Sequence, residues 1–163
     1  MKMRINVKKN RLLTFGLISF FTLILTHLNL PFINNPTIMP NYFLALFVAC
    51  ISINFLNLNL LTIFIMGLLI DLLVGQLIGQ YALTFIIIYY LNFILRKYFV
   101  FSTSPMVSAQ HLILITTGLI TLFISAVSYK LNIELHLFLI KGIFSFVMSL
   151  LYLKIFQYLN NKT

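Results

Sequence analysis

The sequence predicts an all-α integral membrane protein, built as a six-helix transmembrane bundle. Of its 163 residues, 61% are hydrophobic and 8% are charged, and the mean hydropathy is +1.07. Soluble domains carry about 25% charged residues, so this is not the composition of a soluble domain. The second observation is that polar and proline-containing turns divide the apolar sequence into segments near the length of a bilayer span. We expect one polytopic membrane domain over residues 1–163.

The first expected span covers residues 12–30 and follows a strongly basic segment. Five of the eleven basic residues stand in the first eleven positions: Lys2, Arg4, Lys8, Lys9 and Arg11. Basic residues beside a span predict a cytoplasmic N-terminus and contact with anionic lipid headgroups, so the formal charge of +9 does not indicate nucleic acid. No small-x-small cleavage pattern follows the apolar run, so we expect a retained helix and not a cleaved signal peptide.

The apolar stretch from Tyr42 to Val74 predicts two short spans. As one helix it would be about 50 Å long, which exceeds a hydrocarbon core of about 30 Å. Three asparagines, at positions 54, 57 and 59, interrupt the stretch. We therefore expect spans over 41–56 and 58–75 with a hinge at the asparagines. Ala45 and Ala49 form a small-xxx-small pair that suits close helix packing.

Residues 77–95, 111–129 and 133–152 form the remaining expected spans, with a loop over 100–108 before the fifth. Six spans place Arg96-Lys97 on the cytoplasmic side together with both termini, whereas five spans would place this pair outside, so the charges favour six. Small hydroxylated residues follow one face of each of the last two spans, which is typical of helix packing in lipid. They are Thr117, Thr121, Ser125 and Ser128, and then Ser145 and Ser149, the latter two on a stripe with Glu134, Lys141 and Tyr152.

Asp71 is the most informative polar residue, because it is one of only two carboxylates and lies within an apolar run. An ionised group at mid-membrane costs a few kcal/mol or more unless it is paired or hydrated. Gly67, Asp71, Gly75 and Gly79 recur every four residues, so on a helix they would line one face with little side-chain bulk. This spacing indicates an assembly or packing face.

Lys141 lies at a depth in the expected sixth span that nearly matches the depth of Asp71. An Asp71–Lys141 ion pair is therefore one interpretation, and Lys141 joins the four positions above as a candidate assembly residue. Two alternatives remain open: Lys141 extends its amine to the interface, and Asp71 is capped by polar groups near Gln76 or Gln80.

The sequence lacks the residues that the main classes of intramembrane catalysis require. Two isolated acids cannot form an aspartyl-protease dyad or a carboxylate cluster for cations, and neither G-x-S-x-G nor a G-x-x-x-x-G-K-[ST] phosphate loop occurs. His27, His111 and His136 are dispersed and are expected near the membrane interfaces. The single cysteine, Cys50, supports no disulfide within the chain and no metal site. We expect a non-enzymatic protein with no catalytic, cofactor-binding or metal-binding residue.

The segment Met66–Leu83 resembles the central signature of the MreD family of bacterial rod shape-determining proteins. In that family a Gly-Leu-Leu-Leu-Asp-like run leads through a Gly-containing turn to Leu-Gly-x-x-Ala-Leu, and here Leu77-Ile-Gly79-Gln-Tyr-Ala82-Leu83 is similar to the latter. The chain length, the basic N-terminus, the proline-containing loop after the first span and the six expected spans agree with the resemblance.

The resemblance implies a non-enzymatic membrane scaffold subunit of the cell-elongation machinery. Such a subunit links lateral peptidoglycan synthesis to the cytoskeleton from the bacterial cytoplasmic membrane. The implied partners are MreC, MreB, RodA and a class B penicillin-binding protein, together with membrane lipids and without nucleic acid. The implied fold is similar to the substrate-binding subunits of energy-coupling-factor transporters.

That similarity of fold also gives an alternative function, the substrate-capture subunit of an energy-coupling-factor vitamin transporter. Against it, such subunits commonly carry an Ala-xxx-Ala face on the first helix, and residues 12–30 contain no alanine. A vitamin site also requires a polar, aromatic external pocket, and the expected external loops are short. A channel or proton relay would need a chain of ionisable residues across the bilayer, which Asp71 and Lys141 at one depth do not form.

Overall fold

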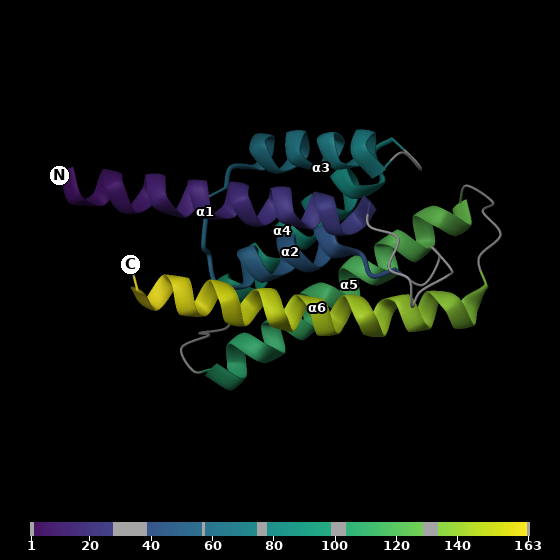
Figure 1. Ribbon diagram of the computed structural model, residues 1–163. Coiled ribbons are helices and arrows are strands. Elements are labelled where there is room, and N and C mark those ends of the chain that lie inside the picture. Colours follow the sequence, from purple (N-terminus) through teal and green to yellow (C-terminus); the bar gives the residue numbers. More distant parts are fainter. Residues whose placement is uncertain are drawn as a thin grey trace.

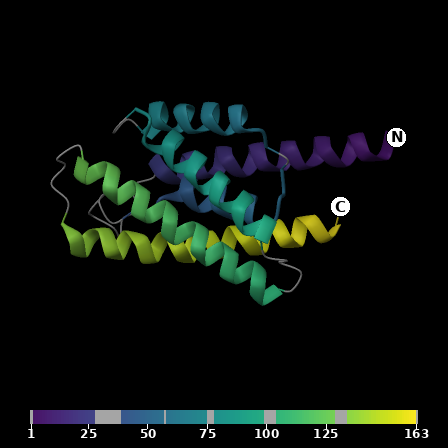
Figure 2. The same cartoon turned by 180° about the vertical axis from the view of Figure 1, so that it is seen from behind.

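The computed structural model describes residues 2–27, 39–56, 58–74, 78–98, 104–128 and 134–162. These residues form six α-helices and contain no strand: α1 (Lys2–His27), α2 (Tyr42–Ser52), α3 (Leu60–Val74), α4 (Gln80–Tyr98), α5 (Ser104–Ser128) and α6 (Leu135–Lys162). The long helices α1 and α6 run in roughly opposite directions, and both chain ends lie at the same end of the bundle (Figure 1). Figure 2 shows α5 crossing α6 on the opposite face.

The short helix α2 forms the centre of the bundle. All eleven of its residues are buried, and it contacts α1, α4, α5 and α6. On one side the Phe47 ring stacks on the Phe85 ring of α4, with centroids 3.9 Å apart. On the other side Ala45 and Ala49 are fully buried in an apolar cluster with residues of α1 and α6. The predicted small-residue packing face is confirmed.

Helix α2 ends at Ser52 because Asn54 turns the chain. Asn54 has a φ of +50°, a conformation that Asn adopts more readily than most residues. Its N–H donates to the Ile51 carbonyl at 3.1 Å, and the Phe55 N–H donates to the Cys50 carbonyl at 3.0 Å. These are the two hydrogen bonds of a Schellman cap. The predicted hinge is therefore found at Asn54, whereas Asn57 lies outside the described residues.

The helices differ from the expected spans at several boundaries. Helix α1 begins at Lys2 and not at residue 12, because the basic segment continues the helix. Helix α5 begins at Ser104, seven residues before the expected start, and Pro105 in its first turn replaces a backbone donor that would have no helical partner. Helix α6 continues to Lys162, ten residues beyond the expected end, because no Gly or Pro follows Tyr152.

The bundle exposes large apolar side chains and buries polar ones. Leu17 of α1 is 70% exposed and Ile143 of α6 is 64% exposed, whereas Asp71, Gln110 and His111 are buried. Soluble monomers rarely present large contiguous apolar patches. Among the described residues, two segments are long and apolar enough to cross a membrane, Val107–Ser128 and Leu135–Leu159. Both observations are consistent with association with a membrane.

Candidate functional site

Asp71 caps the N-terminus of α4 from the preceding helix. Its side chain is 3% exposed and lies three residues before the end of α3. Oδ1 accepts the Tyr81 N–H at 2.7 Å, while Oδ2 accepts the N–H groups of Gly79 at 2.9 Å and Ala82 at 3.3 Å. The first N–H groups of a helix have no partner within it and carry partial positive charge. The buried carboxylate supplies both the acceptors and the negative charge that these groups lack.

Two of the predicted glycines allow this cap to form. A Cβ atom at Gly67 would lie 2.3 Å from the Ala82 Cα and 2.7 Å from the Ala82 nitrogen, so only glycine allows the backbones of α3 and α4 to approach this closely. Gly79 has a φ of +95°, which an L-residue with a side chain rarely adopts. Gly67, Asp71 and Gly79 therefore form one unit, which we call the α3–α4 clamp. Gly75 lies outside the described residues.

Lys141 does not join this unit. No salt bridge connects Asp71 with Lys141 in the described part of the chain. Helix α3 packs mainly on α4, whereas α6 packs on α2 and α5. Similar depth therefore does not make the two residues neighbours, because the order of helices around the bundle separates them. The alternative that Asp71 is capped near Gln80 matches the structure, although the capping groups are backbone amides. The Gln80 side chain instead donates to Ser125 Oγ at 2.8 Å.

A second buried polar cluster surrounds His111, where α2, α5 and α6 meet. The His111 ring is fully buried, with Nδ1 3.0 Å from Ser52 Oγ and Nε2 2.9 Å from Ser149 Oγ. Each serine Oγ also lies 2.7 Å from a backbone carbonyl of its own helix. A neutral imidazole has one donor and one acceptor nitrogen, so one serine must direct its proton to the ring. The arrangement joins three helices through a single side chain.

Basic residues gather near the same end of the bundle as this cluster. Arg96 of α4 donates to the Ser52 carbonyl at 2.7 Å, at the C-terminus of α2. The Arg11 guanidinium lies over the Phe55 ring, 5.8 Å from its centroid. Phe55 in turn lies against Phe156 of α6, with ring centroids 4.7 Å apart. Arg11, Arg96 and the C-terminal part of α6 therefore lie around the C-terminal end of α2.

The N-terminus of α2 has its own polar partners. The Asn41 N–H donates to Ser145 Oγ at 2.8 Å, and the Tyr81 hydroxyl donates to Asn41 Oδ1 at 3.3 Å. Ser145 and Ser149 thus act as packing residues at opposite ends of α2, in agreement with the predicted stripe on α6. On α5, Thr121 contacts Thr84 Oγ1 at 3.3 Å, while Ser128 is exposed and bonds its own helix.

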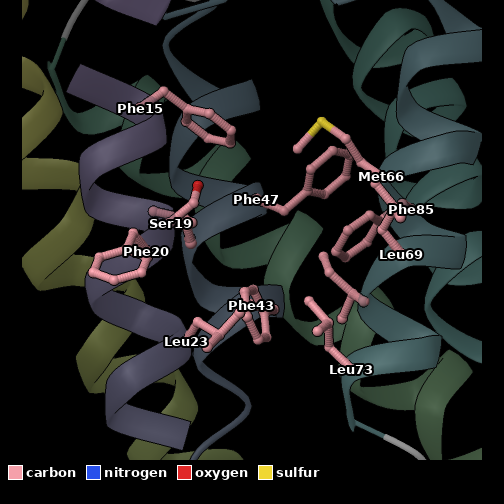
Figure 3. A pocket seen from close by; sticks show the side chains of 12 residues that line it. Phe15, Ser19, Phe20, Leu23, Phe43, Phe47, Met66, Leu69, Leu73 and Phe85 are labelled. Atoms are coloured by element: carbon pink, nitrogen blue, oxygen red, sulfur yellow. The ribbon is translucent and has the colours of Figure 1, made fainter. Parts of the chain in front are cut away.

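An apolar cavity of about 220 Å³ lies between α1 and α3. Its walls come from these two helices, and its floor comes from α2 with Phe85 of α4 (Figure 3). Ser19 supplies the one polar side chain among the twelve lining residues. Its Oγ is buried and has no hydrogen-bond partner in the described part of the chain. The chemistry of the walls suits an apolar ligand and offers almost nothing to orient a polar one.

The sequence predicted Gly67, Asp71 and Gly79 as packing residues but placed them on one helix face, whereas Gly79 lies in the turn before α4. The sequence analysis did not find the His111 cluster or the cavity. His111 was expected at an interface, because a lone histidine in a sequence gives no sign of its partners. Ser149, on the predicted stripe of α6, was the available signal that a polar group would face it. The cavity has no sequence signal, because it depends on the separation of α1 from α3. No group of three or more His, Cys, Asp or Glu residues that could hold a metal ion occurs within the described ranges.

Comparison of the chain with protein-family models, with curated proteins and with solved structures gave no match.

Proposed function

We propose that this chain is a non-enzymatic scaffold subunit of the bacterial cell-elongation machinery, in the manner of the MreD family that its sequence resembles. The observation that carries the proposal is the α3–α4 clamp. The signature residues Gly67, Asp71 and Gly79 are used together to fix one helix on the next. A fixed helical hairpin is what a scaffold needs to present a constant surface to a partner.

The polar side chains support a structural role over a catalytic one. Both oxygens of Asp71 are occupied by backbone donors, and the His111 nitrogens contact two serines that also lie near carbonyls. A general acid or base must reach a substrate, whereas both of these side chains are buried. Their contacts are those of groups that hold helices together.

We further propose that the six helices form a six-span bundle in the bacterial cytoplasmic membrane, with both termini in the cytoplasm. The shared end of the two termini (Figure 1) and the basic residues Arg11 and Arg96 near the C-terminus of α2 support this orientation. Helix α2 is about 16 Å long at 1.5 Å per residue, shorter than a hydrocarbon core. It is covered by other helices on all sides, so it does not need the length of a lipid-facing span.

The cavity weighs against the alternative function of vitamin capture. A water-soluble vitamin needs several polar groups to fix its orientation, and this cavity offers the Ser19 hydroxyl alone. The exposed apolar faces of α1 and α3 instead suit contact with the transmembrane helix of a bitopic protein such as MreC.

Depletion of the protein in its native cell tests the proposal. The expected result is rounding of the cells with normal vitamin uptake, and restoration of rods by the wild-type chain. Complementation with Asp71→Ala is expected to fail, while Ile143→Ala, on the exposed face of α6, serves as the matched control. Unchanged cell shape together with lost uptake of one vitamin would instead support the transporter subunit.

A further inference from the structure

We propose that the cavity between α1 and α3 is a binding site for one acyl chain of a membrane phospholipid, and that Arg11 lies on the headgroup side. Its lining is apolar except for Ser19 and comes from four consecutive helices, α1, α2, α3 and α4. The inference uses the proposed membrane location but is independent of any role in cell shape.

The size of the cavity selects the occupant. An apolar cavity of about 150 Å³ binds benzene, so by proportion about 220 Å³ holds roughly nine carbon atoms. The cavity therefore fits a stretch of alkyl chain.

The arrangement of α1 gives the lipid a direction. Phe15, Ser19 and Leu23 line the cavity at steps of four residues, along one side of the helix. Arg11 stands one further step of four toward the end of the bundle where Arg96 lies. The positive charge that Arg11 and Arg96 give to this end of the bundle favours the phosphate of an anionic lipid whose chain occupies the cavity.

Ser19 is the second observation that indicates a ligand. Its Oγ is buried without a partner among the described residues, and Figure 3 shows the oxygen beside the cavity, above Phe20 and facing the region between Phe15 and Phe47. A buried hydroxyl without a hydrogen bond is costly. The carbonyl oxygen of a lipid ester is the acceptor that such a ligand would supply.

Photolabelling tests the site. The full-length protein is reconstituted in vesicles of phosphatidylglycerol and phosphatidylcholine that contain a trace of phosphatidylglycerol with a photoreactive acyl chain, and the labelled peptides are mapped. The variant Ser19→Phe fills the cavity, and Leu17→Phe places the same side chain on the exposed face of α1. Each buried methylene contributes roughly a fourfold factor in affinity, so displacement of two should lower labelling of the cavity peptides about fifteenfold.

The expected result is strong labelling of the peptides that contain Phe15 to Leu23 and Met66 to Leu73, its loss in Ser19→Phe, and its retention in Leu17→Phe. Replacement of Arg11 by glutamine should reduce the preference of the site for phosphatidylglycerol over phosphatidylcholine. Melting temperatures in detergent confirm that all variants are folded, and if Ser19→Phe is unstable then Leu46→Phe replaces it.

Three outcomes would overturn the proposal. The first is equal labelling of wild type and Ser19→Phe, and the second is labelling spread evenly over the exposed apolar faces. The third is occupancy of the cavity by a second copy of the chain or by the helix of a partner, seen as a protein–protein crosslink that Ser19→Phe abolishes. A failure of the cell-shape experiment would leave all of these readouts unaffected, so the two proposals fail separately.

Discussion

Replacement of Asp71 by asparagine separates the capping role from the ion-pair hypothesis. The substitution keeps the shape of the side chain but leaves one acceptor oxygen in place of two. If the amide oxygen occupies the Oδ2 position, it still accepts the Gly79 and Ala82 N–H groups. The amide NH₂ then faces the Tyr81 N–H, which in the wild type donates to Oδ1 at 2.7 Å, so two donors oppose each other. The opposite rotamer loses two of the three hydrogen bonds.

The magnitude follows from these losses. One buried backbone donor without a partner costs about 1–3 kcal/mol, and loss of the negative charge at a partly buried helix N-terminus costs up to about 2 kcal/mol. We therefore expect Asp71→Asn to lower the free energy of unfolding by about 2–4 kcal/mol and Asp71→Ala, which orphans all three donors, to lower it further.

Reversible unfolding of the purified protein in bicelles, followed for Asp71→Asn, Lys141→Met and the double variant, measures these energies. The cap predicts that the two substitutions add, with a coupling below about 0.5 kcal/mol, because the residues share no contact. Wild-type stability in Asp71→Asn would refute the capping argument, and a coupling above about 1 kcal/mol would restore the ion pair.

Three further predictions concern the glycines and the histidine. Gly67→Ala must move α3 from α4 by about 1 Å to relieve the contacts with Ala82, so it should destabilise the protein by about 1–3 kcal/mol in the same assay. Gly16→Ala is the control: no atom lies within 4 Å of the new Cβ, so this variant should be neutral or stabilising. Gly79→Ala meets no atom either, so its expected cost of about 1–2 kcal/mol comes from backbone strain, and Gly79→Asn should cost less. If His111 is structural, His111→Leu should lower the free energy of unfolding by less than about 2 kcal/mol and preserve cell shape. His111→Ala should lower it by about 2–5 kcal/mol because of the void it leaves. Loss of cell shape with a stable His111→Leu protein would point to a chemical role.

The sequence was sufficient to predict an all-helical chain, the hinge at Asn54 and the packing role of Ala45 and Ala49, because each depends on local propensity or on spacing along one helix. It was insufficient for the partner of Asp71. That partner depends on the turn before α4, which directs three backbone N–H groups at the carboxylate. Gly79 marks a turn in the sequence, but no residue type shows where the N–H groups of that turn point. The start of α5 was placed too late because Pro105 was interpreted as a loop residue, although proline is also favoured in the first turn of a helix.

The buried polar residues follow one physical rule, which is that helix ends inside an apolar bundle need partners from other helices. In hydrocarbon no water is present to satisfy the free N–H and carbonyl groups of a helix terminus. Helix α2 ends within the bundle on both sides. Ser145 accepts the N–H of Asn41, the residue before α2, and Arg96 donates to the carbonyl of Ser52, its last residue. Asp71 does the same for α4. Because these contacts join different helices, they also fix the helices relative to one another. This fixed arrangement would let α1 and α3 hold a lipid chain between them. It would also let them present a constant surface to a partner.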